Sequence, residues 1–561
     1  MKRTLIFIIL VVLLYSVSFA GRFMAAIILL SLLLLFLLYL FISSKKDQLK
    51  FIGIIYAILS FGFVAYVTQT FLGVDYNYHP FISVTVLVIL LPTFFLLGYR
   101  IILSLHCFID SLYQSLRKKN KLVTETSDLS CSVVITTRNE PFDVCKMTFD
   151  SAYNLDYHTQ RKEIVVVDNS DLDNKDFIKW RKYVNKKNMD DGVACKFIHR
   201  NGTEGFKPRN LDIAMENVSF DYVLFLDADS TLPTNALKVG LSEFKKDSKL
   251  GFISFLIEST NYSTNLVTKV ASIFQNTIRY FNEFVGKHGY CNYQGHNGIW
   301  NKKALKAISK WEEYYKSQVM VTEDIAAGFR CYEAGFTSKP VFLKTGEWVP
   351  TSLKEFEKMW LRWSFGGMQV MHKHMSKIIK SPNLHFRVKL DMLYLLFKVV
   401  ASGFPIFALL LVLFPKGNPQ FVLIVNITLV PLFILSFWYY WYGDIQGNIL
   451  SKISQIYVSM FMLSSFVFWC GIKAEINYYL NKPQGWKPTS KVFDKVEGWP
   501  QIIYDNLGKL IFSTFGLAVA IYSIFKFYPQ INFYMYFLCM LPSILLFLNT
   551  ILCVAILGKA R

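Results

Sequence analysis

Long apolar runs stand at both ends of the chain, and a polar stretch lies between them. Each run has about the twenty residues that a helix needs to cross a bilayer. The pattern therefore predicts eight membrane crossings, grouped as four, two and two around the polar middle. The runs cover residues 4–20, 23–42, 51–72, 81–105, 392–414, 421–441, 510–527 and 531–557.

Lysine and arginine residues predict the orientation of these crossings. They precede the first run, lie between the second and third, as at Lys45 and Lys46, and follow the fourth, as at Arg117. The loop between the third and fourth runs, VDYNYHP, has none. The polar middle is therefore expected on the cytoplasmic side of a bacterial cell membrane. Another apolar run covers residues 453–480. If it crossed the membrane, the lysines that follow it would lie outside the cell, so we expect this run to lie in the membrane interface.

The polar middle has the pattern of an α/β domain. Between residues 127 and 381, short apolar strands alternate with helical segments, which is typical of a mostly parallel sheet. Ligands of such sheets bind beyond the carboxyl ends of the strands. A polar residue there is also what any turn requires, so Asp168 alone remains open to that interpretation. The strand-end residues form a candidate site: Thr136, Thr137, Arg138, Glu140, Asp168, Asp227 and Asp229.

These patterns divide the chain into five expected parts. The catalytic candidates all fall in the second part, apart from one loop. The parts are four transmembrane helices (1–106), a cytosolic α/β domain with interfacial helices (107–381), two transmembrane helices (382–442), an interfacial helix with a loop (443–507) and two further transmembrane helices (508–561).

Asp227 and Asp229 suggest a metal site. They follow the apolar run YVLFL at alternate positions, so both carboxylates can point the same way. Hard cations prefer such oxygen ligands, and Mg²⁺ or Mn²⁺ held there can neutralise a diphosphate. We therefore expect one of these two ions as a cofactor.

A second acidic pair, Glu323 and Asp324, opens the helical segment IAAGFRCYEAGF after Thr322. Acidic residues in a first helical turn, behind a threonine cap, stabilise a helix without any catalytic role. A carboxylate at this place can also act as a general base that deprotonates a hydroxyl. The local pattern leaves both interpretations open.

Charge and cysteine content narrow the classes of function. The net charge is +20, but the basic residues gather beside the apolar runs and across the polar domain. An anionic membrane leaflet and a diphosphate substrate account for this excess, so we do not expect nucleic-acid binding. The nine cysteines form no CxxC pair and have no metal-ligand spacing, which is typical of reduced residues.

Taken in order, the segments ITTRNE, VVDNS, EGFKPRN, FLDAD, YQGHNG, VTED and LRWSFGGMQ resemble the processive inverting glycosyltransferases of family 2. This group includes cellulose, hyaluronan, chitin and bacterial β-glucan synthases. The resemblance covers about 250 residues and extends to the membrane layout. It implies a GT-A-type domain inserted in a helical membrane bundle, a UDP-sugar donor and a growing polysaccharide acceptor within a lipid bilayer.

The resemblance also implies roles for the matching positions. Asp324 would be the catalytic base, with Glu323 beside it, and Trp363 would stack on the acceptor sugar. Thr137, Glu140 and Asp168 would hold uridine, and Lys207 and Arg362 would approach the diphosphate. Gly295, His296 and Asn297 would line the acceptor side, while Trp486, Thr489 and Lys491 would form a mobile loop over the nucleotide. By itself, His296 could also be a structural histidine, and the Arg362–Trp363 pair an interfacial anchor.

One motif departs from the family. The family's QxxRW reads here as Met359, Trp360, Leu361, Arg362, Trp363, so the glutamine is absent. Either another residue supplies its polar contact, or the transferring sugar is held differently.

These patterns lead us to expect a membrane-embedded synthase that polymerises a UDP-hexose with inversion and exports the chain. The GHNG segment favours UDP-glucose and a β-glucan. A hyaluronan-like, chitin-like or galactose-containing capsule polymer stays open, as does transfer of one sugar to a membrane lipid. A non-catalytic scaffold is the other alternative, and the intact DAD, TED and RW segments argue against it.

Overall fold

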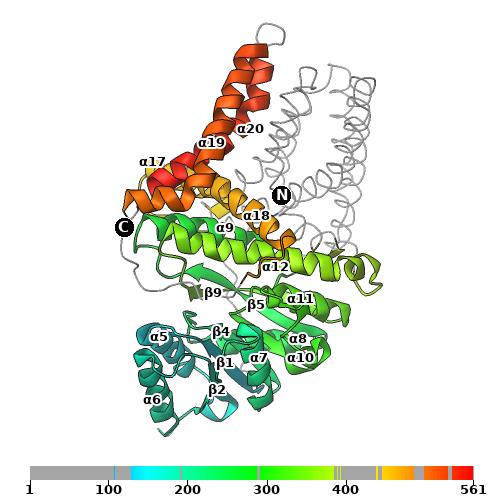
Figure 1. The fold of residues 1–561 in the computed structure, drawn as a ribbon. Coiled ribbons are helices and arrows are strands. Elements are labelled where there is room, and N and C mark those ends of the chain that lie inside the picture. Colours follow the sequence, from blue (N-terminus) through cyan, green and yellow to red (C-terminus); the bar gives the residue numbers. More distant parts are fainter. Residues whose placement is uncertain are drawn as a thin grey trace. The chain divides into compact units, whose positions relative to one another are not determined.

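A mixed sheet of seven strands forms the centre of the α/β domain, in the order β3-β2-β1-β4-β6-β5-β9 (Figure 1). The computed structural model describes residues 107, 128–189, 192–286, 291–384, 388, 389, 392, 438, 439, 445–484, 498–527 and 533–559. The strands are β1 (Cys131–Thr137), β2 (Lys162–Asp168), β3 (Ala194–His199), β4 (Tyr222–Asp227), β5 (Leu250–Ser259), β6 (Gly298–Asn301) and β9 (Thr337–Glu347), with a separate hairpin of β7 (Tyr314–Tyr315) and β8 (Gln318–Val319).

Strand direction determines where the site can form. β1 pairs in parallel with β2 and β4, β2 with β3, and β5 with β9. Only β6 runs antiparallel to its sheet neighbours, β4 and β5. All the sheet strands other than β6 therefore end at one edge, so the expectation of a mostly parallel sheet is confirmed.

Helices cover both faces of this sheet, which explains why its strands are continuous apolar runs. One face packs on α5 (Phe142–Tyr153), α6 (Lys175–Met189) and α8 (Ala236–Lys246), where Phe149, Trp180 and Leu237 are buried. The side chains of β1, β2 and β4 in that core come from alternate positions, such as Ile135 and Leu226. The intervening positions face the other side, where the Phe225 ring meets the Trp311 ring at 5.2 Å.

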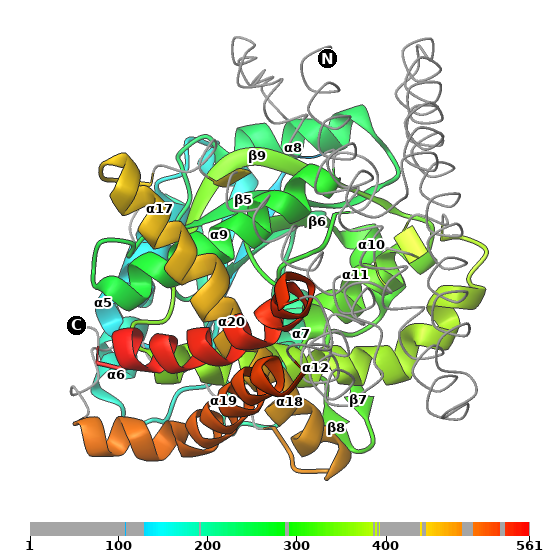
Figure 2. The same ribbon diagram turned by 90° about the horizontal axis from the view of Figure 1, so that it is seen from above.

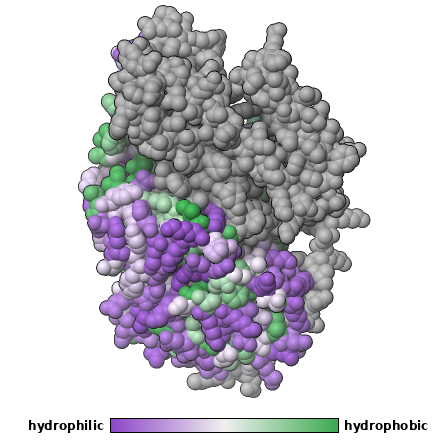
Figure 3. Space-filling view, turned by 90° about the vertical axis from the view of Figure 1, so that its right-hand side faces the viewer, coloured by the Kyte–Doolittle hydropathy of each residue, from purple (hydrophilic) through white to green (hydrophobic). Residues whose placement is uncertain are grey.

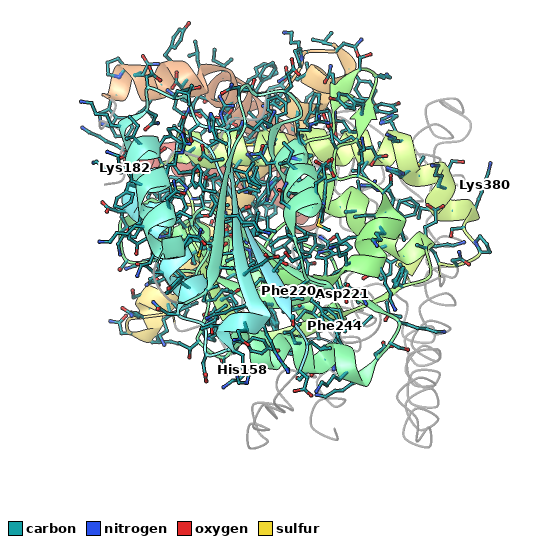
Figure 4. The ribbon with its side chains drawn as sticks, turned by 90° about the horizontal axis from the view of Figure 1, so that it is seen from below. His158, Lys182, Phe220, Asp221, Phe244 and Lys380 are labelled. Carbon is teal, nitrogen blue, oxygen red and sulfur yellow. The ribbon has the colours of Figure 1, made fainter. Side chains whose placement is uncertain are left out.

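The remaining helices of the domain connect the strands and extend beyond them. They are the short η1 (Thr159–Arg161), α7 (Phe206–Asn217), α9 (Leu266–Gly286), α10 (Lys302–Ile308), α11 (Glu323–Glu333) and α12 (Leu353–Lys380). Figure 4 shows Phe220, Asp221 and Phe244 together beside the amino end of β4, the end opposite Asp227. Hydrophilic side chains dominate the described surface visible in Figure 3.

A long helix after the domain packs on it. α17 (Ile449–Tyr457), a π-helical turn (Val458–Leu463) and α18 (Ser464–Tyr479) are continuous, and Figure 2 shows α17 crossing α9. The Ser459 hydroxyl donates to the Val270 carbonyl at 2.9 Å, and the Tyr478 ring stacks on His372 of α12 at 5.1 Å. The helical assignment of 453–480 is confirmed, although the helix begins earlier.

Among the described residues, two helices are long and apolar enough to cross a membrane, 449–479 and 499–526. The first lies mostly against the protein, since 61% of its apolar 18-residue stretch is buried. The second is most of α19 (Trp499–Phe527), which begins before the predicted run, and α20 (Phe533–Leu557) matches the last run. Apart from Met392, Trp438 and Tyr439, the six predicted crossings before residue 442 fall outside the described residues, and so does the loop with Trp486, Thr489 and Lys491.

Candidate functional site

A cavity of about 160 Å³ opens at the edge where the parallel strands end. Strand ends, the beginning of α11 and one face of α12 contribute to it, so segments far apart in the sequence meet there. Its wall includes these predicted residues: Thr136, Thr137, Arg138, Glu140, Lys207, Asp227, Asp229, Gly295, His296, Glu323, Asp324, Arg362 and Trp363.

Lys207 of α7 lies at the centre of the charged groups. Its ammonium nitrogen is 2.6 Å from Asp227 Oδ1 and 3.7 Å from Glu323 Oε1, and it donates to the Gly295 carbonyl at 3.2 Å. Burial favours the neutral amine, yet the charges of Asp227 and Glu323 raise the pKa of Lys207 above its ordinary value. The cavity therefore contains a permanent cation beside the strand-end carboxylates.

Asp227 and Asp229 both line the cavity, as their alternate positions predict. The Asp229 carboxylate accepts a long hydrogen bond, 3.4 Å, from the Trp348 amide. No cluster of three or more metal-ligating side chains occurs among the described residues. This donor set fits a hard cation that takes two protein oxygens and completes its shell with ligand oxygens.

The acidic pair Glu323 and Asp324 begins α11, directly after Thr322. Thr322 makes no side-chain capping bond, but both acids lie in the first turn of the helix, where Asp324 Oδ1 accepts a hydrogen bond from the Ile325 amide at 2.8 Å. The structural and the catalytic interpretation of this pair therefore both stay open. Burial raises the pKa of Glu323 to about 7, and it also raises the pKa of Asp324. Both carboxylates can therefore take up a proton far more readily than exposed acids do.

α12 holds this acidic segment in place. Gln369 accepts a hydrogen bond from the Val321 amide at 3.1 Å and donates to the Val319 carbonyl at 3.1 Å. Gly366 lies so close to Thr322 that a methyl group at this position would be only 2.4 Å from Thr322 Cγ2. The helix and the acidic pair are thus positioned by direct contact.

The contact at Gly366 gives a testable prediction. Gly366→Ala should force Thr322 away from α12, lowering the free energy of unfolding by about 1–3 kcal/mol through overpacking. The cavity wall should be disturbed with it, because Asp324 moves with Thr322. The matched control is Gly328→Ala in α11, where an added methyl group meets nothing within 4 Å. The free energy of unfolding of that variant should rise by about 0.5–1 kcal/mol, because alanine has a higher helix propensity than glycine. Equal thermal shifts for both variants would contradict this interpretation.

α12 also brings three further side chains to the wall: Met359, Arg362 and Trp363. They share one helix face because they are three and four residues apart. Burial lowers the pKa of Arg362 below its ordinary value. The negative charges of Glu323 and Asp227 act in the opposite direction but do not outweigh burial. The Trp363 ring lies edge-on to Trp360 at 5.1 Å, which holds the indole in place.

His296 belongs to a buried ion network. Its Nε2 is 2.6 Å from Glu347 Oε2, and the Arg279 guanidinium pairs with the other oxygen of Glu347. Burial alone would lower the pKa of His296, but Glu347 raises it above its ordinary value. Burial would raise the pKa of Glu347, but Arg279 and His296 lower it to about 2. His296 is therefore held as a cation at the cavity wall.

Two predicted residues lie behind the wall instead of lining it. The Asp168 side chain points toward α6, as Thr137 does, and its carboxylate accepts a hydrogen bond from the Thr137 hydroxyl at 2.5 Å. The next residue, Asn169, points the opposite way and lines the cavity. Asn297 is fully buried, and its amide donates to Thr345 Oγ1 at 3.0 Å and to the Gly346 carbonyl at 3.2 Å. Neither side chain is among those that line the cavity, and the contacts of Asp168 and Asn297 with a ligand stay predictions.

The cavity wall also includes residues that the sequence patterns did not single out. The most informative is Glu347, at the end of β9, since it orients His296. The others are Asn169, Phe206, Asn210, Ala228, Gln294, Val321, Trp348, Val349 and Pro350.

Comparisons with known proteins match this domain. Residues 132–309 match the family model described as "Glycosyl transferase family 2", and residues 222–442 match "Glycosyl transferase family group 2". A poly-beta-1,6-N-acetyl-D-glucosamine synthase of Staphylococcus epidermidis is 27% identical over 321 residues, which is 55% of this chain and 72% of that protein. A probable glycosyltransferase of Sulfolobus acidocaldarius is 24% identical over 47% of this chain and 55% of its own length.

Solved structures are similar to this chain only at low identity and low TM-score. A mannosyltransferase of Pyrobaculum calidifontis, in complex with GDP-Man and Mn²⁺, has a TM-score of 0.42 and 14% identity, covering 69% of this chain and 97% of that one.

Proposed function

We propose that this chain, which carries a family 2 glycosyltransferase domain, is a membrane-associated enzyme that polymerises a sugar from a UDP-sugar donor into a β-linked polysaccharide. The observation that carries this proposal is the convergence of three groups in one cavity: the strand-end pair Asp227 and Asp229, the helix-start pair Glu323 and Asp324, and the α12 pair Arg362 and Trp363. Each group has a different task in transferring a sugar.

The donor side needs positive charge. Departure of a nucleoside diphosphate leaves negative charge on its oxygens, and two cations line the cavity wall, the buried Lys207 and the half-buried Arg362. A Mg²⁺ or Mn²⁺ ion at Asp227 and Asp229 would supply further positive charge to the diphosphate. Arginine suits this role because its planar fork matches phosphate oxygens. The strand-end residues Thr136, Thr137, Arg138 and Glu140 extend the wall toward a nucleoside.

The acceptor side needs a base and a platform. In the proposed step, a hydroxyl oxygen of the acceptor attacks the anomeric carbon from the face opposite the diphosphate, and its proton passes to Asp324. The bond from that carbon to the diphosphate oxygen breaks, and its electron pair leaves with UDP. One attack of this kind inverts the configuration. The Trp363 indole offers an apolar face to a pyranose ring.

Two UDP-sugars should be tested first as donors. The GHNG segment favours UDP-glucose, whereas the similarity to an N-acetylglucosamine polymer synthase favours UDP-N-acetylglucosamine. The cavity wall combines polar side chains with apolar ones, such as Val349 and Met359. This mixed lining is compatible with either donor, so the product has to be identified directly.

The test is a reaction of the purified chain with a panel of UDP-sugars, followed by size analysis of the labelled product. Polymer from one or two donors supports the proposal and names the sugar. A product of fixed size in the lipid fraction would favour transfer of one sugar to a lipid instead. Failure of every donor to release UDP would contradict the proposed activity.

Metal removal gives a separate prediction. Because the described part of the chain has no cluster of three or more metal-ligating side chains, we expect the ion to bind mainly with the donor and to exchange freely. EDTA should abolish transfer, and Mg²⁺ or Mn²⁺ should restore it within the mixing time. Full activity in EDTA, after dialysis against the chelator, would contradict the metal assignment.

Two apolar helices support the membrane association and, with it, the proposal that the product is exported. A hydrophilic chain cannot cross lipid unaided, so fusion of synthase and membrane helices has a physical purpose. In sealed inverted vesicles given external UDP-sugar, export predicts polymer that an added glycosidase reaches only after detergent. Polymer that is digested without detergent would argue for release on the cytoplasmic side.

A further inference from the structure

Gln275 of α9 is a buried amide with poor partners. Its side chain is 2% exposed, and its amide nitrogen donates to the Met359 sulfur at 3.6 Å. Its amide oxygen is buried and has no hydrogen-bond partner among the described residues. A thioether is a weak acceptor, and a buried carbonyl without a partner destabilises the fold. The amide is therefore poorly explained as a purely structural group.

Met359 is the side chain that covers this amide. It lines the cavity together with Arg362 and Trp363, while Gln275 touches its sulfur from behind. Methionine has three rotatable bonds and no branch, so it changes conformation more easily than other apolar residues. One adaptable side chain therefore separates the Gln275 amide from the space where a sugar would bind.

The backbone around the pair is fixed by aromatic packing. The Phe274 ring meets the Trp360 ring at 5.5 Å and the Phe356 ring at 6.1 Å, so α9 and α12 are packed together beside Gln275 and Met359. On the other side of Gln275, the Asn276 side chain accepts from the Ser259 amide at 3.2 Å. Exposing Gln275 requires the Met359 side chain to move, while the helices stay where they are.

We propose that Gln275 is a sugar-binding residue of this cavity: Met359 covers it in the ligand-free protein, and its amide hydrogen bonds a pyranose hydroxyl once Met359 swings aside. This inference rests on the proposed function. An amide both donates and accepts, as a hydroxyl does, so one glutamine can satisfy a sugar hydroxyl in both directions. It also accounts for the departure from the QxxRW motif. Position 359 has a methionine in place of the glutamine, and the Gln275 amide lies directly behind that methionine side chain.

The experiment compares kcat/KM and thermal unfolding of the original chain and three variants. Gln275→Leu keeps the volume and removes the amide; we expect kcat/KM to fall about tenfold, as for the loss of one hydrogen bond. Its unfolding temperature should stay the same or rise, because a buried carbonyl without a partner is gone. Ser272→Ala, which removes another buried polar group from α9, is the matched control and should keep full activity.

The third variant combines Gln275→Leu with Met359→Gln, which returns an amide to the wall from α12. Recovery of kcat/KM to within about threefold of the original chain would support the proposal. A rise in KM for the UDP-sugar alone would identify the donor sugar as the ligand, and a rise for the acceptor alone the acceptor sugar. Unchanged kcat/KM in Gln275→Leu, or a loss that Met359→Gln does not repair, would overturn it. If the original chain transfers no sugar at all, the proposed function fails first, and this inference with it.

Discussion

Asp324→Asn should reduce sugar transfer by about 10²- to 10⁴-fold, the usual contribution of a general base. Asparagine keeps the size of the side chain but cannot take the acceptor proton. Binding of UDP should change little, because Lys207 and Arg362 remain in place. The measurements are initial rates of UDP release and calorimetric titration with UDP.

Glu323→Gln is the matched comparison for this prediction. Glu323 lies 3.7 Å from Lys207, so we expect it to tune charge around the donor, with a smaller loss of rate than Asp324→Asn. If Glu323→Gln were the inactive variant and Asp324→Asn the active one, the two roles would be exchanged. A non-catalytic scaffold would tolerate both substitutions without loss of its function.

The pH dependence of kcat/KM follows from the same pair. The base must be ionised to accept a proton, and burial raises the pKa of Asp324 above its ordinary value. Activity should therefore fall as the pH drops through this raised pKa, at a higher pH than for an exposed aspartate. Glu323→Gln removes a neighbouring negative charge, which should lower the pKa of Asp324 and move the ascending limb to lower pH. A limb that stays in place would show that the two carboxylates do not interact.

Glu347→Gln should lower the free energy of unfolding by about 3 kcal/mol, since removing one partner of a buried ion network leaves charges uncompensated. Arg279 and His296 both depend on Glu347; these two residues are buried, and the Glu347 side chain is only 12% exposed. His296 would also lose the largest charge that raises its pKa, so its pKa should fall. We therefore expect a lower melting temperature together with reduced transfer.

Asp156→Asn provides the control for that loss of stability. Asp156 pairs with Lys238 at 2.5 Å, but its side chain is 68% exposed. Exposed ion pairs contribute about 0–1 kcal/mol, so this variant should melt close to the original chain. Similar melting temperatures for the two variants would contradict the assignment of Glu347 as a buried network residue.

Sequence patterns identified the parts of the site that follow continuous apolar strands. β1, β2 and β4 are buried on both faces, so their runs are unbroken and their ends are easy to locate. Asp227 and Asp229 follow directly from the end of β4. Glu323 and Asp324, like Arg362 and Trp363, were found through family motifs, and the fold brings all of them to one cavity.

The missed residues have less regular surroundings. β9 pairs with β5 through two register irregularities, so Thr337–Glu347 has no clean alternation and its end at Glu347 was not recognised. Arg279 and Gln275 are polar residues of α9, and in sequence they resemble the solvent face of an amphipathic helix. For Asp168 and Asn297 the ligand contacts stay predictions, because the strand face and the backbone turn, which a sequence pattern does not determine, decide which side chain lines the cavity.

The order of strands also has a consequence for synthesis on the ribosome. β4, which leads into Asp227 and Asp229, has β1 on one side but must wait for β6 on the other, and β6 begins only at Gly298. During translation the β1, β2, β3 and β4 half can assemble first, with one edge of β4 open. An open edge invites pairing with foreign strands. Pauses or truncations between residues 227 and 298 should therefore yield nascent chains that depend on chaperones.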